Sequence, residues 1–145
     1  MDTKELQTTY YRLQTRIMDP IADTIIQIKN AGSAGKETTT VPYSKFRHAV
    51  VLALLKAGYI TFADKKIRKQ KKVLEIEIAY KNGKPRIQDV KKISKLSRRL
   101  YVGSKKLWRV RQGYGDIFLS TPQGIFTARE AKAKNIGGEV LFEIW

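Results

Sequence analysis

Residues 73–80, near the middle of the chain, read VLEIEIAY, and apolar side chains alternate there with acidic ones. This period of two predicts a β-strand with one buried face, because successive side chains of a strand point to opposite sides. The residues predicted on the buried face are Leu74, Ile76, Ile78 and Tyr80. Asn82-Gly83 follows and favours a tight hairpin turn. Residues 64–72, with six basic side chains, are expected to form an exposed hairpin or loop before the strand.

Two helices are predicted before this strand. In the first, Ile21, Ile25 and Ile28 recur at helical spacing, after an N-cap at Asp19 and before a stop at 30–32. In the second, Ser44 is the predicted N-cap and Gly58 the C-terminal stop. Its predicted buried face consists of Phe46, Val50 and Leu54. Short strands are expected at 39–42 and 59–63.

The last thirty residues also carry local signals. A buried strand at 117–120 leads into a turn at 121–124, and Thr127 with Glu130 forms a capping box for a short helix at 128–134. A final alternating strand is predicted at 139–145. The predicted class is α+β. We divide the chain into an N-terminal extension (1–17), an N-terminal α/β module (18–85) and a smaller, β-rich C-terminal module with one short helix (86–145).

Charge constrains the function more than any motif does. The chain holds 29 Lys and Arg against 13 Asp and Glu, a formal net charge of +16. Residues 81–111 contain twelve Lys and Arg, and Asp89 is their one acid. Such a basic stretch could also be a solvated surface or could bind an anionic membrane. An excess of positive charge that local acids do not balance favours nucleic acid as the partner. No apolar run is long enough to predict a membrane-spanning helix.

The sequence offers little for catalysis. Cysteine is absent, and His48 is the one histidine, placed in a predicted helix without an acid cluster beside it. Glu75 and Glu77 share a strand face, but two carboxylates are too few for metal-dependent phosphodiester cleavage. We therefore expect no enzyme, no resident metal and no cofactor. A metal-dependent nuclease is kept as the third alternative, ranked below a general RNA- or DNA-binding protein.

Two features suggest where nucleic acid would bind. Tyr101 and Trp108 lie among basic residues and suit either stacking on bases or packing in the core. The turn at 120–124 presents two hydroxyls, Ser120 and Thr121, before Gly124. A glycine in such a turn lets backbone and side chains approach phosphates or base edges closely, although an ordinary hairpin turn would look the same.

Residues 18–145 contain, in this order, Asp19-Pro20-Ile21-Ala22-Asp23, Ile28, Asn30, Pro42, Ser44-Lys45, Ile93-Ser94-Lys95, Arg99-Leu100-Tyr101, Gly113, Gly115, Ser120-Thr121, Gly124, Thr127, Arg129-Glu130-Ala131 and Gly137-Gly138-Glu139. On these residues, this part of the chain resembles the universal small-subunit ribosomal protein eight family, bacterial type. Residues 1–17 have no counterpart in the typical bacterial protein and form an atypical extension.

The resemblance implies a structural constituent of the small ribosomal subunit that binds the central domain of its rRNA early in assembly. It implies RNA contacts in the C-terminal module, with phosphate contacts added from the N-terminal one. The residues we expect at the RNA are Ser120, Thr121, Pro122, Gly124, Tyr101, Gly138, Glu139, Lys45, Arg98 and Arg99. Neighbouring proteins such as small-subunit protein five are implied partners, and some family members also bind their own mRNA. The implied location is the bacterial cytoplasm, in preference to an organellar ribosome.

The chain departs from the family pattern at the turn. The family usually reads Ser-Thr-Ser-Lys-Gly there, but this sequence has Pro122 and Gln123. A hydroxyl, a backbone N–H and a cation are therefore missing where the RNA is expected. Ala128 also replaces a usual Asp, and Trp108 a usual proline.

Overall fold

The computed structural model describes residues 20–94, 98–108 and 115–145. The helices are α2 (Pro20–Ser33), α3 (Lys45–Lys56), α4 (Ala128–Ala133) and the short 3₁₀ helix η1 (Ser104–Lys106). The strands are β1 (Thr38–Pro42), β2 (Ile60–Arg68), β3 (Lys71–Ile78), β4 (Tyr80–Lys81), β5 (Lys84–Pro85), β6 (Val90–Lys92), β7 (Tyr101–Val102), β8 (Asp116–Thr121), β9 (Gly124–Thr127) and β10 (Gly138–Ile144). The α+β class is as predicted. None of the helices in the described part of the chain is long and apolar enough to cross a membrane.

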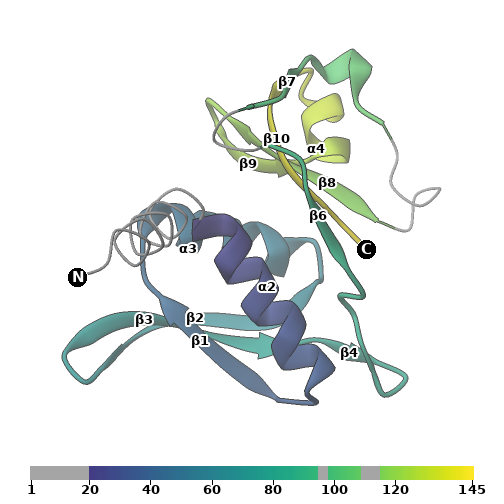
Figure 1. Ribbon diagram of the computed structural model, residues 1–145. Coiled ribbons are helices and arrows are strands. Elements are labelled where there is room, and N and C mark those ends of the chain that lie inside the picture. Colours follow the sequence, from purple (N-terminus) through teal and green to yellow (C-terminus); the bar gives the residue numbers. More distant parts are fainter. Residues whose placement is uncertain (1–19, 95–97, 109–114) are drawn as a thin grey trace, which may run out of the picture.

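Helices α2 and α3 lie between two antiparallel sheets, a three-stranded sheet (β1-β3-β2) and a five-stranded one centred on β10 (Figure 1). The isoleucine stripe of α2 is buried as predicted, with Ile25 and Ile28 each 1% exposed. The predicted N-cap Asp19 lies outside the described residues. Ser44 caps α3 as predicted, because its side chain accepts a hydrogen bond from the Arg47 N–H at 3.0 Å.

Two predictions about buried side chains are wrong. Phe46 is 39% exposed, whereas Val50 and Leu54 are buried as predicted and Val51 is buried with them. Tyr80 is also 39% exposed. Its strand ends at Ile78 and the chain enters a second hairpin, β4–β5, where the Tyr80 hydroxyl donates to the Lys36 carbonyl. Leu74, Ile76 and Ile78 are buried as the alternation predicts.

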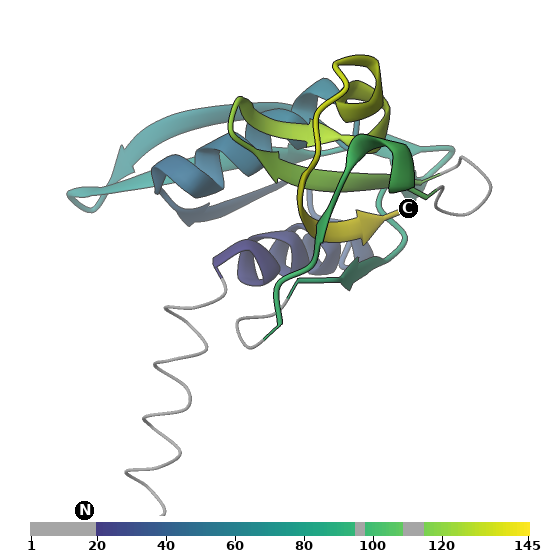
Figure 2. The ribbon, with the colours of Figure 1, turned by 90° about the horizontal axis from the view of Figure 1, so that it is seen from above.

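Residues 64–72 form a hairpin and not a loop, because β2 and β3 pair as far as Arg68 and Lys71. The hairpin extends away from the helices and its end is exposed (Figures 1 and 2). Lys69 and Gln70 form its turn, with φ angles of 51° and 66°. Asn82 and Gly83 form the β4–β5 turn, as predicted, with φ angles of 54° and 76°.

The five-stranded sheet forms the C-terminal part of the chain. Strand β10 pairs with β8 on one side, and on the other with β6 and then β7, while β9 extends the sheet beyond β8. The predicted capping box is present: Thr127 accepts from the Glu130 N–H and Glu130 accepts from the Thr127 N–H. This box starts α4, which packs on β8 and β9.

The larger hydrophobic core joins both sheets. Phe118 and Phe142 of the C-terminal sheet pack with Ile25 and Leu54 of the helices, and all four are 1% exposed or less. Each sheet therefore buries part of its apolar surface through the other. Truncating one of these buried Phe side chains to Ala would cost about 3–5 kcal/mol of stability. A smaller cluster, which includes Leu119 and Ala131, lies between α4 and the opposite face of the sheet. The boundary at 85/86 stays a prediction.

Candidate nucleic-acid interface

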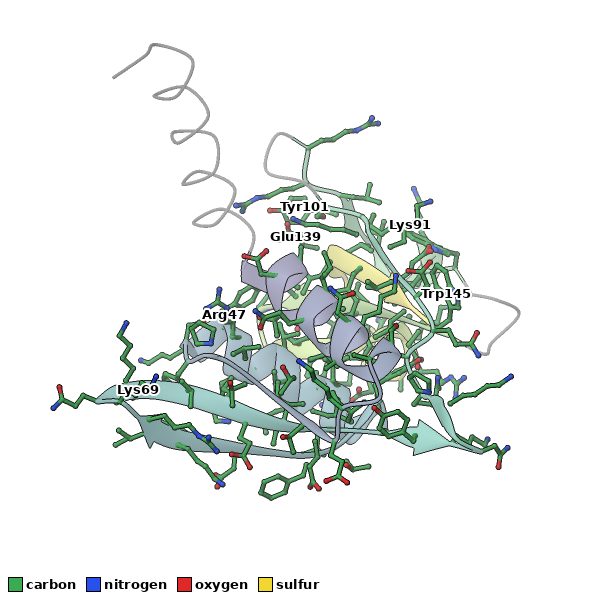
Figure 3. All side chains as sticks on the ribbon, turned by 60° about the horizontal axis from the view of Figure 1, so that its bottom comes forward. Arg47, Lys69, Lys91, Tyr101, Glu139 and Trp145 are labelled. Carbon is green, nitrogen blue, oxygen red and sulfur yellow. The ribbon has the colours of Figure 1, made fainter. Side chains whose placement is uncertain are left out.

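Three of the expected contact residues lie side by side across one end of the C-terminal sheet. Glu139 of β10 is opposite Tyr101 of β7 on one side and opposite Ser120 of β8 on the other. Directly paired residues of antiparallel strands project from the same face. We call Tyr101, Glu139 and Ser120 the sheet row; it continues the face on which Phe118 lies two residues before Ser120. Figure 3 shows Tyr101 and Glu139 together at this end of the molecule.

Tyr101 and Trp108, which the sequence could not tell apart, have different surroundings. The Tyr101 ring is 65% exposed and is available to stack on a base. Trp108 is half-buried, packs against the smaller core cluster and donates its indole N–H to Glu143. Of the two, Tyr101 therefore belongs to the candidate interface and Trp108 to the protein interior.

The segment before Tyr101 is held by backbone contacts. The Leu100 N–H donates to the buried Ser94 hydroxyl at 3.0 Å, and the Leu100 carbonyl accepts from the Val140 N–H at 2.8 Å. These bonds fix the backbone beside Arg98 and Arg99, both of which are exposed. Arg99 Nε lies 3.8 Å from Glu139 Oε1. The carboxylate thus holds one cation at the sheet row and keeps acceptor capacity for a ribose hydroxyl or a base amino group.

The two hydroxyls of the turn are not equivalent. Thr121 Oγ1 donates to the Gly124 carbonyl at 2.7 Å and accepts from the Gln123 N–H at 3.2 Å. It therefore closes the turn from within. Ser120 Oγ has no hydrogen-bond partner among the described residues, and Ser120 lies in the sheet row. Pro122 and Gln123 are exposed at the tip of the turn.

Both expected glycines are required by the backbone. Gly124 has a φ of 133°, which residues with a Cβ rarely adopt. A Cβ on Gly138 would lie 2.3 Å from the Ser120 carbonyl oxygen, so β10 could not approach β8 there. These glycines shape the sheet row, and an exposed backbone at Gly124 leaves room for close contact with a ligand.

The structure does not bring Lys45 to this site. Lys45 is the first residue of α3 and is exposed. No contact between described residues joins its side chain to the sheet row. The other end of α3 faces the C-terminal sheet, where Lys56 Nζ lies 2.8 Å from Glu130 Oε2.

The candidate catalytic residues are not assembled into a site. His48 packs its ring beside Tyr43, with the ring centres 5.7 Å apart. Hydrogen bonds from Lys66 and Arg68 hold the pKa of Glu75 below its ordinary value. Within residues 20–94, 98–108 and 115–145, no three potential ligands are grouped to hold a metal ion.

The basic residues of the β2–β3 hairpin were not predicted to have a role, although their charge is visible in the sequence. Of the six cations in residues 64–72, five lie on the two strands that leave the body of the protein and Lys69 lies in the turn that joins them. The charge run was apparent in the sequence, but its projection was not. Which cations face the same side depends on the register of two strands, and this register appears only in the fold.

Together, these features define an α+β protein of the nucleic-acid-binding class, strongly basic and with an aromatic ring, a hydroxyl and paired charges at one sheet end. Comparison with known sequences gives the particular family. A family model described as Ribosomal protein S8 matches residues 19–145. The chain therefore belongs to the ribosomal protein S8 family, which consists of ribosomal proteins and not of enzymes.

Curated relatives match over almost their whole length. The protein from Oleidesulfovibrio alaskensis is 42% identical over 129 residues, which cover 89% of this chain and 99% of the relative. That from Mycoplasmopsis agalactiae is 40% identical, with 89% and 98% covered, and that from Gluconobacter oxydans is 41% identical, again with 89% and 98% covered. Each is named small ribosomal subunit protein uS8.

Proposed function

We propose that this protein is a structural constituent of the small ribosomal subunit that binds rRNA through the sheet row and the neighbouring turn. The single observation that carries the proposal is the register of β7, β10 and β8. It aligns an exposed ring (Tyr101), a carboxylate that holds Arg99 (Glu139) and a hydroxyl that bonds none of the described residues (Ser120). Such a set suits an irregular RNA with unstacked bases and accessible 2′-hydroxyls.

The charge distribution supports the same proposal. A formal charge of +16 supplies salt-dependent attraction to phosphates, which carries no sequence information. Arg98 and Arg99 are exposed beside the sheet row and would neutralise phosphates there. Specificity would then come from the few groups of the row and the turn. The proposed function is binding, and it requires no catalytic role from any residue of the sheet row.

We further propose that the RNA lies in the central domain of the small-subunit rRNA, and that the modules meet at residues 85/86. Small-subunit protein five is the proposed neighbour, and the protein's own mRNA a second RNA target. The proposed location is the bacterial cytoplasm rather than an organelle. These finer proposals rest on the family resemblance. The geometry of the sheet row is compatible with them.

A binding assay tests the proposal directly. The full-length chain is titrated with a central-domain fragment of bacterial small-subunit rRNA and with a 3′-domain fragment of equal length, at the same salt concentration. We expect the central-domain fragment to bind at least about tenfold more tightly, a difference of 1.4 kcal/mol. Equal affinity for both fragments would favour a general nucleic-acid-binding protein. Cleavage of either fragment that a chelator abolishes would favour a nuclease.

A further inference from the structure

A groove lies between α2 and β6, where a helix of the N-terminal part of the chain runs beside a strand of the C-terminal sheet (Figure 1). Its most deeply buried lining residues are Ile25 and Phe142, each 1% exposed. Ile26 and Val90 also line it, and Ile26 is 46% exposed. The groove is therefore an apolar hollow directly above the core, at the junction of the two parts of the protein.

The size and the edge of this groove suit a few apolar side chains. Its volume is about 280 Å³, below the range of about 300–1,000 Å³ that is typical of small-molecule sites. Polar residues, Lys29, Asn30 and Lys92, line it beside the apolar ones. Lys29 Nζ lies 2.8 Å from Asp89 Oδ1, so an ion pair joins α2 to the residue before β6. An apolar hollow with polar groups around it is a common binding site for the apolar face of an amphipathic helix.

The segment before α2 carries such a face and is joined to the helix beside the groove. Its apolar residues recur at intervals of four, three and four, the spacing of one helix face. They are Leu6, Tyr10, Leu13 and Ile17. All of them precede the part of the chain that matches the family model, so the family assignment gives them no role. The segment leads into Pro20, the first residue of α2, and Ile21 already lines the groove.

The charge of this segment differs from that of the rest of the chain. Residues 1–19 contain three Lys or Arg and three Asp or Glu. The remaining residues hold 26 basic side chains against 10 acidic ones, and so they carry the whole formal charge of +16. A segment with balanced charge gains little from phosphates, because their attraction depends on unpaired cations. An apolar groove of the protein is therefore a better partner for this segment than RNA.

The lengths along the chain allow the segment to reach the groove. A residue before proline disfavours helical backbone, so Asp19-Pro20 marks a break between the segment and α2. Two helices joined by a short loop pack side by side in opposite directions. Leu13 lies seven residues before Pro20 and Ile26 six residues after it, which is ~10 Å and ~9 Å at a helical rise of 1.5 Å per residue. Folding back at the break would thus place Leu13 opposite Ile26.

We propose that residues 1–17 form an amphipathic helix that folds back on α2 and docks its apolar face in the groove between α2 and β6. Leu13 and Tyr10 then cover Ile26 and Val90. The docked helix fastens α2 to a strand of the C-terminal sheet and so stabilises the junction between the two parts of the protein. This role does not depend on whether the sheet row binds rRNA.

The absence of cysteine permits a direct test in the full-length chain. The double variant Leu13→Cys/Ile26→Cys is treated with a short bifunctional maleimide, and intramolecular cross-linking is followed by mass spectrometry. Leu13→Cys/Leu52→Cys is the matched control, because Leu52 of α3 is also 46% exposed but lies outside the groove. We expect the 13/26 pair to react at least about tenfold faster, since docking raises the effective concentration of its two thiols. Equal rates would overturn the proposal, and so would a cross-linked dimer of the 13/26 variant, which would assign the groove to a second copy.

A double-mutant cycle tests whether the contact stabilises the protein. Leu13→Ala and Ile26→Ala should each lower the melting temperature, and the double variant should melt no lower than the less stable single variant, because effects of residues in contact do not add. Leu13→Ala combined with Leu52→Ala should show additive losses instead. Additive losses at 13 and 26, or a Leu13→Ala protein as stable as the parent, would overturn the proposal.

RNA binding distinguishes the groove from the other destination of the segment. The full-length variant Tyr10→Ser/Leu13→Ser changes no charge, so it should lower the melting temperature and leave the affinity for the central-domain rRNA fragment unchanged. Weaker RNA binding with an unchanged melting temperature would assign the segment to the RNA and overturn the proposal. A parent protein that does not bind this fragment would remove the proposed function, whereas the cross-linking result would still decide the docking of the segment.

Discussion

The Tyr59 hydroxyl donates a hydrogen bond to Asp116 Oδ2 at 2.6 Å, and so joins the residue before β2 to the first residue of β8. Arg86 lies over the Tyr59 ring, with its guanidinium carbon 4.3 Å from the ring centre. Burial and the Asp116 carboxylate raise the pKa of the Tyr59 hydroxyl above its ordinary value. The tyrosine is therefore a neutral donor at physiological pH and links the two sheets.

Tyr59→Phe should destabilise the protein by about 1.5–3 kcal/mol, the range for a hydrogen bond to a charged partner. The ring and its contact with Phe118 would remain, so the loss reports the hydroxyl alone. Chemical denaturation at neutral pH measures the change, and Tyr80→Phe is a control whose hydroxyl bonds only a surface carbonyl. A Tyr59→Phe protein as stable as the parent would show that Asp116 finds equivalent solvation without the tyrosine.

A second link, between α3 and α4, depends on pH. Partial burial of Glu130 acts to raise the pKa of its carboxyl. The hydrogen bonds from Lys56 and from Thr127 outweigh this effect and hold the pKa of Glu130 below its ordinary value. A carboxylate whose pKa is lower in the folded state stabilises the protein above its unfolded pKa, about 4.3, and this stability is lost as pH falls through the folded pKa. The Lys56 side chain is 72% exposed, so the ion pair contributes at most about 1 kcal/mol.

Glu130→Gln should therefore be slightly less stable than the parent at pH 7, and the two proteins should become equally stable as the pH falls below the folded-state pKa of Glu130. Glutamine at this position still supports the capping box, so the variant removes mainly the charge. Lys56→Gln should give the same convergence. Melting temperatures measured between pH 3 and 7 provide the comparison, and a gap that persists in acid would show that the cap, not the charge, was lost.

Local signals in the sequence predicted the elements well. The alternation at 73–80 predicted β3, and Thr127 with Glu130 predicted the start of α4, because a strand face and a capping box each depend on residues close in sequence. Phe46 and Tyr80 were assigned wrongly to the core. Helical and strand periodicity identifies a face, but where that face meets its partner depends on where the strand ends and which side of the helix the sheet covers.

The sheet row could not be predicted from local pattern. Tyr101, Ser120 and Glu139 come from three strands that are distant in sequence, and their alignment follows from two antiparallel registers. The family resemblance suggested the residues without their arrangement. The unequal roles of Ser120 and Thr121 were also hidden, because adjacent hydroxyls look alike until the turn assigns one of them to the Gly124 carbonyl.

Neutralising the exposed arginines next to the sheet row should weaken binding to all RNAs alike. If Arg98 and Arg99 each neutralise a phosphate, replacing both with Gln should lower the slope of log K against log salt by about 1.4–1.8. If the Arg99 guanidinium mainly orients Glu139, 3.8 Å away, Arg99→Gln alone should lower this slope by less than one full phosphate contact would. Filter binding across a salt series measures these slopes. A folded double variant with the parent's slope would mean that neither arginine meets a phosphate.

The two hydroxyls of the turn allow RNA recognition and protein stability to be tested separately. Thr121 bonds within the turn, whereas Ser120 bonds none of the described residues. Ser120→Ala should weaken binding to the central-domain rRNA fragment by about 1–3 kcal/mol, since the RNA group it contacts would lose its partner. Thermal stability should not change, because this hydroxyl bonds no described residue. Thr121→Ala should instead lower the stability by about 0.5–1.5 kcal/mol through loss of the bonds to Gly124 and Gln123.

Pro122→Ser completes this series at the position where the chain departs from its family. Proline has no N–H to donate and its φ is fixed, so serine restores a hydroxyl and a backbone donor at the exposed tip. We expect rRNA affinity to be unchanged or slightly higher, while affinity for unrelated RNA stays constant in all three variants. Isothermal titration with both RNAs measures these effects. If Ser120→Ala binds the rRNA fragment as tightly as the parent, recognition depends on Tyr101 and Glu139, and alanine variants at those two positions should then show the loss.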